Sequence, residues 1–195
     1  MAPKEEVKAI RPPADHYHAQ TRNGAELARA FGVAESTVKR YLDLLTAALV
    51  VRQLPPWHEN ISKRQLRSPK VYLRDSGLLH RLLGIGGFDE LQSHPKVGAS
   101  WEGFALEQIL HSHDVSADNA YFWGTHAGAE LDLLVLRGTQ RWGFEIKRSS
   151  APRMSRSLHV AISDLGLTRA SIVYPGTQRY ALAEKVEAVP LAELL

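Results

Sequence analysis

The sequence predicts an α/β fold, α+β overall, in which a small helical module precedes a larger domain of alternating strands and helices. Between residues 23 and 57, helix, turn, helix and strand patterns follow one another. After about residue 70, the order strand, helix, strand predicts a β-α-β crossover. With 44% hydrophobic and 23% charged residues among 195, the chain has enough apolar material for a folded core and too little charge for disorder.

Composition excludes several classes of function. The chain has no cysteine, which excludes a disulfide framework, thiolate zinc sites and cysteine nucleophiles. No apolar run approaches the roughly 18 residues of a membrane span, and the first residues lack the apolar middle of a signal peptide. We therefore expect a cytoplasmic protein without a membrane partner.

Basic residues are concentrated in two stretches of a nearly neutral chain. The net charge is +3, yet residues 60–75 contain five Lys or Arg against one acid, and residues 137–156 contain six against one. Such stretches favour nucleic-acid binding, and a solvated protein surface is the alternative. The residues in them that we expect to contact nucleic acid are Lys63, Arg64, Arg67 and Arg148.

Composition shifts along the chain predict four segments. Prolines and the absence of an apolar period mark residues 1–22 as an arm or a disordered segment, and residues 23–57 form a winged-helix-like module. A basic linker at 58–69 then leads to the larger domain at 70–195. A winged helix normally has a further helix in front, which the arm does not supply.

The small module has the residues that a helix-turn-helix needs. Ala28 is small where two helices would cross, Gly32 tolerates the positive φ of the turn, and Val38 would contact the first helix. Asn23 and Ser36 are expected to cap the first and second helix. Apolar residues of the second helix, spaced by three and four, predict one buried stripe: Val38, Tyr41, Leu42, Leu45 and Leu49.

The opposite side of the second helix is polar and basic. In a winged helix this side enters a DNA groove and the trailing strand forms the wing, so we expect contacts from Thr37, Lys39 and Arg40. Folds of this kind also serve as plain protein-protein modules. DNA binding and a partner-binding role therefore both stay open.

A β-hairpin carries the residues with the most chemistry. Residues 130–136 and 141–147 read as strands joined by four loop residues that include Gly138. If residue 136 pairs with 141, then Asp132 faces Glu145 and Glu130 faces Lys147. On the opposite face the apolar pairs would be Leu131 with Ile146, Leu133 with Phe144, and Val135 with Trp142.

This register sets two carboxylates face to face, with Cβ atoms roughly 5 Å apart, which is unfavourable unless something compensates. A hard divalent cation such as Mg²⁺ takes oxygen ligands and would bridge Asp132 and Glu145. Lys147 on the same face could orient a water or stabilise charge on a phosphodiester. The alternative is a solvated charged face in which Glu130 pairs with Lys147.

Asp132 followed across a hairpin by Glu145-Ile146-Lys147 resembles the PD-(D/E)xK nuclease superfamily. The resemblance implies a restriction-endonuclease-like mixed sheet flanked by helices. It also implies that Asp132 and Glu145 bind the metal, Mg²⁺ or Mn²⁺, and that Lys147 is the catalytic lysine.

The same family has a glutamate on the helix that precedes the hairpin. By resemblance this residue would be Glu102, since its helical neighbours are small or apolar, and Glu107 is the second choice. His126, just before the acidic strand, could approach a bound phosphate. We expect the other histidines, among them the pairs His16 with His18 and His111 with His113, to lie on the surface.

Longer strings resemble the C-terminal module of a prokaryotic family of AAA-type ATPases. They run from about residue 23 to 190 and include LPPW, SPKVYLRDSGLLHRLLG, HPKVGASWEGFALEQIL and GFEIKRS. The resemblance implies a partner ATPase domain. These 195 residues contain no G-x-x-x-x-G-K-[ST], so we expect no ATP binding here, and either an expressed fragment or a truncated gene product.

Three functions follow from these observations. The first is a DNA-associated module that hydrolyses phosphodiesters with a divalent cation. The second is a catalytically inactive regulatory or protein-interaction module with a nuclease-like fold. The third is a winged-helix DNA-binding regulator.

Overall fold

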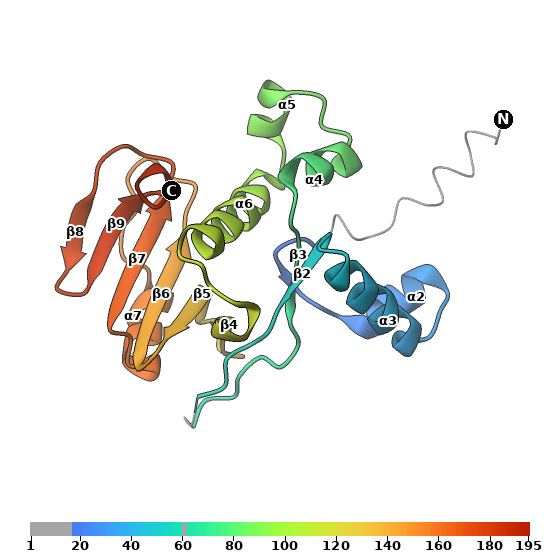
Figure 1. The fold of residues 1–195 in the computed structure, drawn as a ribbon, viewed down its shortest axis with the longest axis horizontal. Coiled ribbons are helices and arrows are strands. Elements are labelled where there is room, and N and C mark those ends of the chain that lie inside the picture. The colour runs from blue at the N-terminus through green and yellow to red at the C-terminus, as the bar shows by residue number, and fades with distance from the viewer. Residues whose placement is uncertain (1–16, 60–61) are drawn as a thin grey trace.

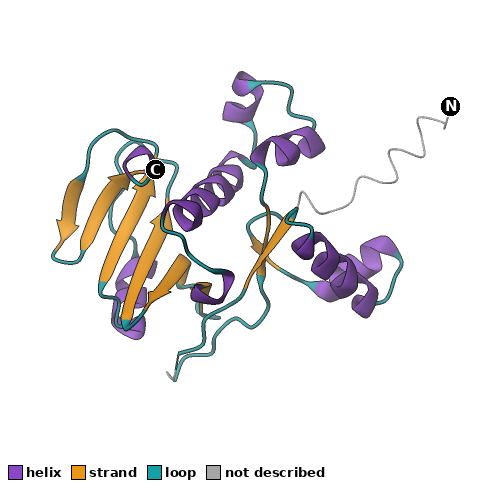
Figure 2. Ribbon diagram, viewed as in Figure 1, coloured by secondary structure: helices purple, strands orange, loops and turns teal. Residues whose placement is uncertain are grey.

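The computed structural model describes residues 17–59 and 62–195. A small sheet carries a pair of helices, and a larger mixed sheet is flanked by further helices (Figures 1 and 2). The predicted α/β class is confirmed. Most of the predicted arm, residues 1–16, lies outside the described residues. In the described part of the chain, no helix is long and apolar enough to cross a membrane.

The helix pair consists of α2 (Gly24–Phe31) and α3 (Glu35–Ala47). Asn23 caps α2 as predicted, because its side chain accepts a hydrogen bond from the Glu26 backbone N–H at 3.2 Å. Gly32 ends the helix in the left-handed conformation with φ 63°, where a Cβ would be strained. Ala28 and Val38 are buried together, which confirms the predicted contact between the helices.

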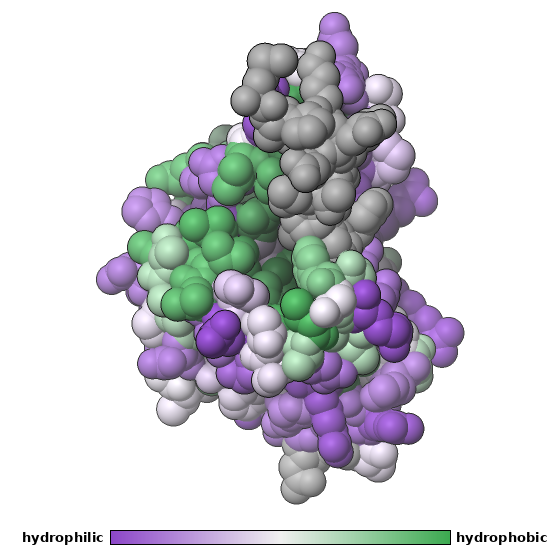
Figure 3. Space-filling model, turned by 90° about the vertical axis from the view of Figure 1, so that its right-hand side faces the viewer, coloured by the Kyte–Doolittle hydropathy of each residue, from purple (hydrophilic) through white to green (hydrophobic). Residues whose placement is uncertain are grey.

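Two predictions about α3 are wrong. The residue before the helix is Ala34, so Ser36 lies within the first turn instead of capping it. The predicted apolar stripe is buried only at Val38, whereas Tyr41 and Leu49 are 55% and 68% exposed. Among residues 17–59 and 62–195, α2 and β2 pack most against α3, and side chains of these residues leave Tyr41, Leu44, Leu45 and Leu49 exposed. Figure 3, which views the right-hand side of the molecule in Figure 1, shows hydrophobic areas (green) next to hydrophilic ones (purple).

The small sheet has the strand order β1 (Gln20–Thr21), β3 (Lys70–Leu73), β2 (Val51–Leu54), with antiparallel neighbours. Lys70 is opposite Leu54 and Thr21. The predicted segment boundaries at residues 22 and 70 therefore separate strands that pair with one another. The reason is that long-range pairing joins the arm, the module and the first strand of the predicted large domain.

The predicted basic linker packs against the large sheet over its described residues. Leu66 donates its backbone N–H to the Gly124 carbonyl at 2.9 Å. A Cβ on Gly124 would lie 2.8 Å from a Leu66 methyl carbon, so this glycine permits the close approach. Trp123 donates its indole N–H to the Gln65 side chain at 3.2 Å.

The large sheet has six strands in the order β4-β5-β6-β7-β9-β8. Their bounds are β4 Ala120–Gly124, β5 Glu130–Arg137, β6 Gln140–Ile146, β7 Arg169–Tyr174, β8 Tyr180–Ala183 and β9 Val186–Pro190. Strands β6 and β7 are parallel and are joined through α7 (Arg156–Leu165), which confirms the predicted β-α-β crossover. Helix α6 (Val97–Ser112) and α7 contribute to separate core clusters, each with residues of the sheet.

The remaining elements are short. Helix α4 (Ser76–Leu83) begins after Asp75, whose carboxylate accepts the Leu78 backbone N–H and caps the helix. Helix α5 (Phe88–Ser93) follows and leads into α6, and the two 3₁₀ turns are η1 (Ala117–Asn119) and η2 (Leu191–Glu193). Helix α6 lies between the small sheet and the large one, in contact range of both (Figure 1).

Candidate functional site

The predicted hairpin register is confirmed over most of its length. Strands β5 and β6 pair from Leu133 opposite Phe144 to Arg137 opposite Gln140, as the sequence predicted for residues 136 and 141. The turn contains two residues instead of four, with Gly138 at φ 60°. The hairpin therefore presents the candidate acids where the paired ladder ends.

A β-bulge changes the geometry beside Asp132. Tyr121 of β4 pairs with Leu134, but Trp123 pairs with Leu131, so β5 holds one extra residue in this interval. Leu131 packs in the cluster that contains α7, whereas Ile146 packs in the cluster that contains α6. The predicted pairing of Leu131 with Ile146 is therefore wrong, because the bulge turns Leu131 to the other face.

One carboxylate oxygen of Asp132 accepts a backbone hydrogen bond, and the other lies near the ammonium group of Lys70. Its Oδ2 accepts the Ile146 backbone N–H at 2.8 Å, which replaces a ladder hydrogen bond, and its Oδ1 lies 3.8 Å from Lys70 Nζ. Burial and the charge of Glu102 raise the pKa of Asp132 to about 7, against the opposing effects of Lys70, the Ile146 N–H and Lys147. The protein therefore disfavours the charged form of this carboxylate.

Lys70 lies at the centre of the acids. Its ammonium is 3.2 Å from Glu102 Oε1 and pairs with Glu130, and only 3% of its side chain is exposed. Burial lowers the pKa of Lys70, but the charges of Glu102, Asp132 and Glu130 outweigh it and raise the pKa overall. The predicted pairing of Glu130 with Lys147 is wrong, because Lys70 takes Glu130 as its partner.

Tyr72, two residues after Lys70 on β3, donates its hydroxyl to the same Glu102 oxygen at 2.7 Å. Burial raises the pKa of Tyr72 well above its usual value, and the charge of Glu102 and its hydrogen bond raise it further. Glu102 therefore receives two donors from one strand of the small sheet.

Glu145 and Lys147 form the second half of the cluster. Lys147 Nζ lies 2.9 Å from Glu145 Oε1, and Ser155 donates its hydroxyl to Oε2 at 3.0 Å. Burial lowers the pKa of Lys147, but the hydrogen bond and charge of Glu145, with Asp132 and Glu102, raise it overall. Glu145 is buried while 47% of the Lys147 side chain is exposed, so the ammonium can reach a ligand from solvent.

The cluster contains more carboxylates than ammonium groups. Glu102, Glu130, Asp132 and Glu145 face only Lys70 and Lys147 in these contacts. Within residues 17–59 and 62–195, no group of three His, Cys, Asp or Glu is arranged to hold a metal ion. The arrangement can bind positive charge or hold a polar substrate group near Lys147.

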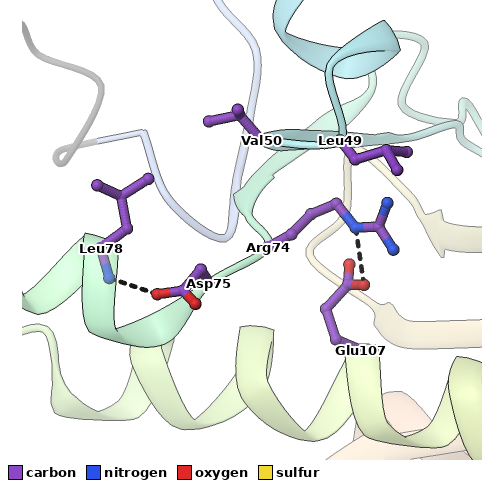
Figure 4. Close-up of a pocket in the computed structure, with 6 residues that line it drawn as sticks. All are labelled: Leu49, Val50, Arg74, Asp75, Leu78 and Glu107. Carbon is purple, nitrogen blue, oxygen red and sulfur yellow. Dashed lines mark hydrogen bonds and ion pairs between the residues drawn. The ribbon is translucent and has the colours of Figure 1, made fainter.

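Glu107, the second choice for the helix glutamate, lies elsewhere. It pairs with Arg52 of β2, with 2.9 Å between Arg52 Nη2 and Oε2, and with Arg74, whose Nε is 3.0 Å from Oε2. Figure 4 shows Arg74 reaching Glu107 at the edge of a pocket that Leu49, Val50, Asp75 and Leu78 also line. Glu107 thus ties α6 to the small sheet, whereas Glu102 joins the candidate site.

The other predicted residues are spread over several elements. His126 is exposed in the β4–β5 turn, beside Arg64, whose carbonyl accepts its backbone N–H at 2.9 Å. Lys63 pairs with Asp164 at 2.6 Å. Arg148 donates to Gln92, and Arg67 is exposed. On α3, Thr37 is half-buried, Lys39 pairs with Asp43, and Arg40 stacks against Tyr41.

An apolar hollow lies beside the segment that follows β6, next to Lys147 in the sequence. Its wall combines helices α4, α5 and α6 with the segment after β6, and three of its lining side chains are aromatic. Its lining includes Phe88, Trp101, Phe104 and Arg148. Of these, Phe88 is 73% exposed.

Sequence reasoning missed two residues that hold the site together. Lys70 and Tyr72 were not predicted as site residues, although their spacing of two places them on one face of a strand. The prediction that His18 is a surface residue is wrong. Its side chain is 2% exposed and lies between the Leu73 N–H and the Ala99 carbonyl, each 3.1 Å away.

The fold and site define an α/β protein with a buried acid-lysine cluster between two sheets. Residues 97–194 match the family described as Domain of unknown function (DUF4143), which covers half of the chain, so the chain belongs to this family. Residues 11–89 match a second model, Domain of unknown function (DUF8612).

Two curated relatives are similar over most of the chain. Uncharacterized protein Rv2008c of Mycobacterium tuberculosis (strain ATCC 25618 / H37Rv) and uncharacterized protein Mb2031c of Mycobacterium bovis (strain ATCC BAA-935 / AF2122/97) are each 55% identical over 180 residues, or 92% of this chain. The chain spans 40% of the length of each relative. No solved structure matches.

Proposed function

We propose that the chain is a DNA-associated module with a PD-(D/E)xK nuclease-like site that hydrolyses phosphodiester bonds with Mg²⁺ or Mn²⁺. The observation that carries the proposal is the grouping of Asp132, Glu145, Lys147 and Glu102 around the end of the β5–β6 ladder. The surplus of carboxylates in this group supports a role for an added cation.

The donor chemistry of the cluster fits a hard divalent cation. Carboxylate oxygens are the ligands that Mg²⁺ prefers, and Asp132 and Glu145 would hold it. Such an ion would supply Lewis acidity and lower the pKa of a bound water. Lys147, half exposed and held by Glu145, would stabilise negative charge on a phosphodiester oxygen.

Exposed basic and aromatic groups support a nucleic-acid substrate. Arg64 and Arg67 are exposed along the large sheet, and the second helix of the winged-helix-like module presents Lys39 and Arg40. The apolar hollow beside Arg148 would accept a base against Phe88 or Phe104. We also propose that, in the longer relatives, an AAA-type ATPase domain occupies part of the remaining length.

The test is cleavage of single- and double-stranded DNA by the purified chain with Mg²⁺, Mn²⁺ or EDTA. Asp132→Ala and Lys147→Ala should each lower the metal-dependent rate at least about 100-fold. Glu107→Gln is the matched control, because this residue bonds Arg52 and Arg74 instead. A rate that is equal in the wild type and both site variants would overturn the proposal.

A non-catalytic regulatory or protein-interaction module is the second candidate. The contacts of Lys70 favour it, because an ammonium already balances part of the charge that a metal would balance. Under this alternative, calorimetry detects no Mg²⁺ or Mn²⁺ binding, and Asp132→Ala changes stability alone.

The basic surface also favours a third candidate, a winged-helix DNA-binding regulator. Its affinity for DNA should fall with salt, with a log-log slope of about 0.9 per neutralised phosphate. A flat salt dependence would exclude it.

A further inference from the structure

We infer that Lys70 fills the cation position of the acid cluster, so that its ammonium and a divalent cation compete for Glu102 and Asp132. The inference rests on the proposed metal site and adds a residue that the nuclease resemblance does not assign. Under this inference, residues of both the small sheet and the large sheet form the site.

The contacts of Lys70 are those of a buried counter-ion. Its Nζ is 3.2 Å from Glu102, is paired with Glu130 and lies 3.8 Å from Asp132. The Phe122 ring, with its centroid 5.6 Å from Nζ, provides an aromatic neighbour. A buried ammonium is costly without such partners, and so are carboxylates without a cation.

The oxygen that Lys70 binds is already saturated in this arrangement. Glu102 Oε1 accepts hydrogen bonds from both Lys70 and the Tyr72 hydroxyl. A metal ion could take this oxygen only if these donors moved away. By contrast, Asp132 Oδ1 lies beyond hydrogen-bond distance from the ammonium, so a cation has easier access to it.

Strand pairing determines where Lys70 lies. As the first residue of β3 it is opposite both Thr21 and Leu54, so its backbone is paired on both sides. Lys70 falls in the first matched segment, residues 11–89, whereas Glu102, Asp132 and Glu145 fall in the second, residues 97–194. A shift of β3 relative to α6 would withdraw the ammonium from the acids.

The first measurement is calorimetric titration of the full chain with Mn²⁺. Lys70→Met removes the competing charge and should raise the affinity at least about 10-fold over the wild type. Lys185→Met, which changes an exposed lysine of the β8–β9 turn, is the control and should bind as the wild type does. If Lys70→Met does not fold, Lys70→Gln, whose amide can still donate to Glu102, provides the same comparison.

The second measurement is a double-mutant cycle by chemical denaturation, without metal. The effects of Lys70→Met and Glu102→Gln should be strongly non-additive, since each leaves the other group unpaired. Lys70→Met and Glu107→Gln should be additive, because Glu107 pairs with Arg52 of β2 and with Arg74 after β3, and not with Lys70.

The outcomes separate this inference from the proposed hydrolase. Additive effects at positions 70 and 102, or equal Mn²⁺ affinity in the wild type and Lys70→Met, would overturn competition by Lys70. Non-additivity with no Mn²⁺ binding in either protein would overturn both the hydrolase and the competition, and would leave Lys70 as a counter-ion alone, whereas measurable but equal affinities would overturn the competition only. Non-additivity with tighter Mn²⁺ binding in the variant supports both.

Discussion

Helix α6 carries two glutamates, five positions apart, that both contact the small sheet. Their surroundings differ in net charge: acids are in excess around Glu102, and bases are in excess around Glu107. Glu102 meets Lys70 in a group where carboxylates outnumber ammonium groups. Glu107 meets two guanidinium groups, those of Arg52 and Arg74. Both contacts link α6 to the same sheet, yet only the first leaves unbalanced negative charge.

The difference explains why one contact is a candidate site and the other a clamp. Arginine binds a carboxylate through two parallel hydrogen bonds, as Arg52 does with Glu107, and leaves the acid fully satisfied. A single lysine cannot satisfy three carboxylates, so Asp132 retains a pKa raised to about 7 by burial and by Glu102. Excess charge at one end of the helix is therefore available for chemistry.

The largest expected loss of stability comes from removing Lys70, and removing Arg74 from the other contact provides the comparison. Lys70→Met leaves buried acids without their cation and should lower the free energy of unfolding by about 3–5 kcal/mol. Arg74→Met should cost about 1 kcal/mol, because Arg52 remains on Glu107 and Arg74 is partly exposed. Urea denaturation measures both. Equal losses would show that the two contacts are equivalent and would remove the basis of the comparison.

The pH dependence of stability tests the packing of His18 between β3 and α6. Burial, with the charges of Lys96 and His80, lowers its pKa from 6.5 to about 4, although a hydrogen bond to Ala99 opposes this. The unfolded chain takes up this proton below pH 6.5 but the folded chain resists it until about pH 4. The contribution of neutral His18 to the free energy of unfolding is therefore fully present above pH 6.5 and is lost as the pH falls toward 4.

Urea denaturation at a series of pH values from about 7.5 to about 4 should show a loss on the order of 2 kcal/mol in the free energy of unfolding from this group. His18→Gln should flatten the profile over that range. His80, whose pKa burial also lowers, contributes in the same direction and remains in both proteins. A variant profile parallel to that of the wild type would show that His18 is not the responsible group.

Two glycines of α6 provide a matched pair of substitutions. A Cβ on Gly103 would lie 2.6 Å from the His18 ring, whereas one on Gly98 would meet nothing within 4 Å. Gly103→Ala should therefore cost about 1–3 kcal/mol through overpacking. Gly98→Ala should be neutral or stabilise by up to about 1 kcal/mol, because alanine favours the helix. Thermal unfolding measures both, and equal effects would contradict close packing at His18.

The smallest effect on the candidate site is expected from Glu107→Gln. The amide keeps an acceptor for Arg52 and Arg74, so the free energy of unfolding should fall by only about 1–2 kcal/mol. Mn²⁺ affinity and cleavage should equal those of the wild type. A change in metal affinity would show that the two glutamates share one electrostatic unit.

Local patterns were sufficient for much of the fold. The cap Asn23 and the turn glycine Gly32 were predictable because each satisfies backbone groups within a few residues. The pairing of residue 136 with 141 was predictable because the alternating apolar residues agree with only one register. Strand β4, helix α5 and strand β8 were not predicted as separate elements.

The candidate site was predictable only in part. The spacing along one hairpin predicted Asp132, Glu145 and Lys147 as site residues. The apolar neighbours of Glu102 favoured this glutamate over Glu107. The bulge beside Asp132 could not be predicted from the sequence, because it depends on how β4 pairs with β5. The roles of these residues stay predictions until cleavage and metal binding are measured.

The sequence by itself determined the α/β class, the β-α-β crossover and the hairpin that carries two acids and a lysine, since these follow from periodicity and turn chemistry within short segments. Only the tertiary structure decided that Lys70 and His18 are buried against α6. Their burial depends on pairing between β1, β2 and β3, which are up to about fifty residues apart and leave no short-range pattern. A residue's charge partner is set by such long-range contacts, and here these partners decide which acids remain unbalanced.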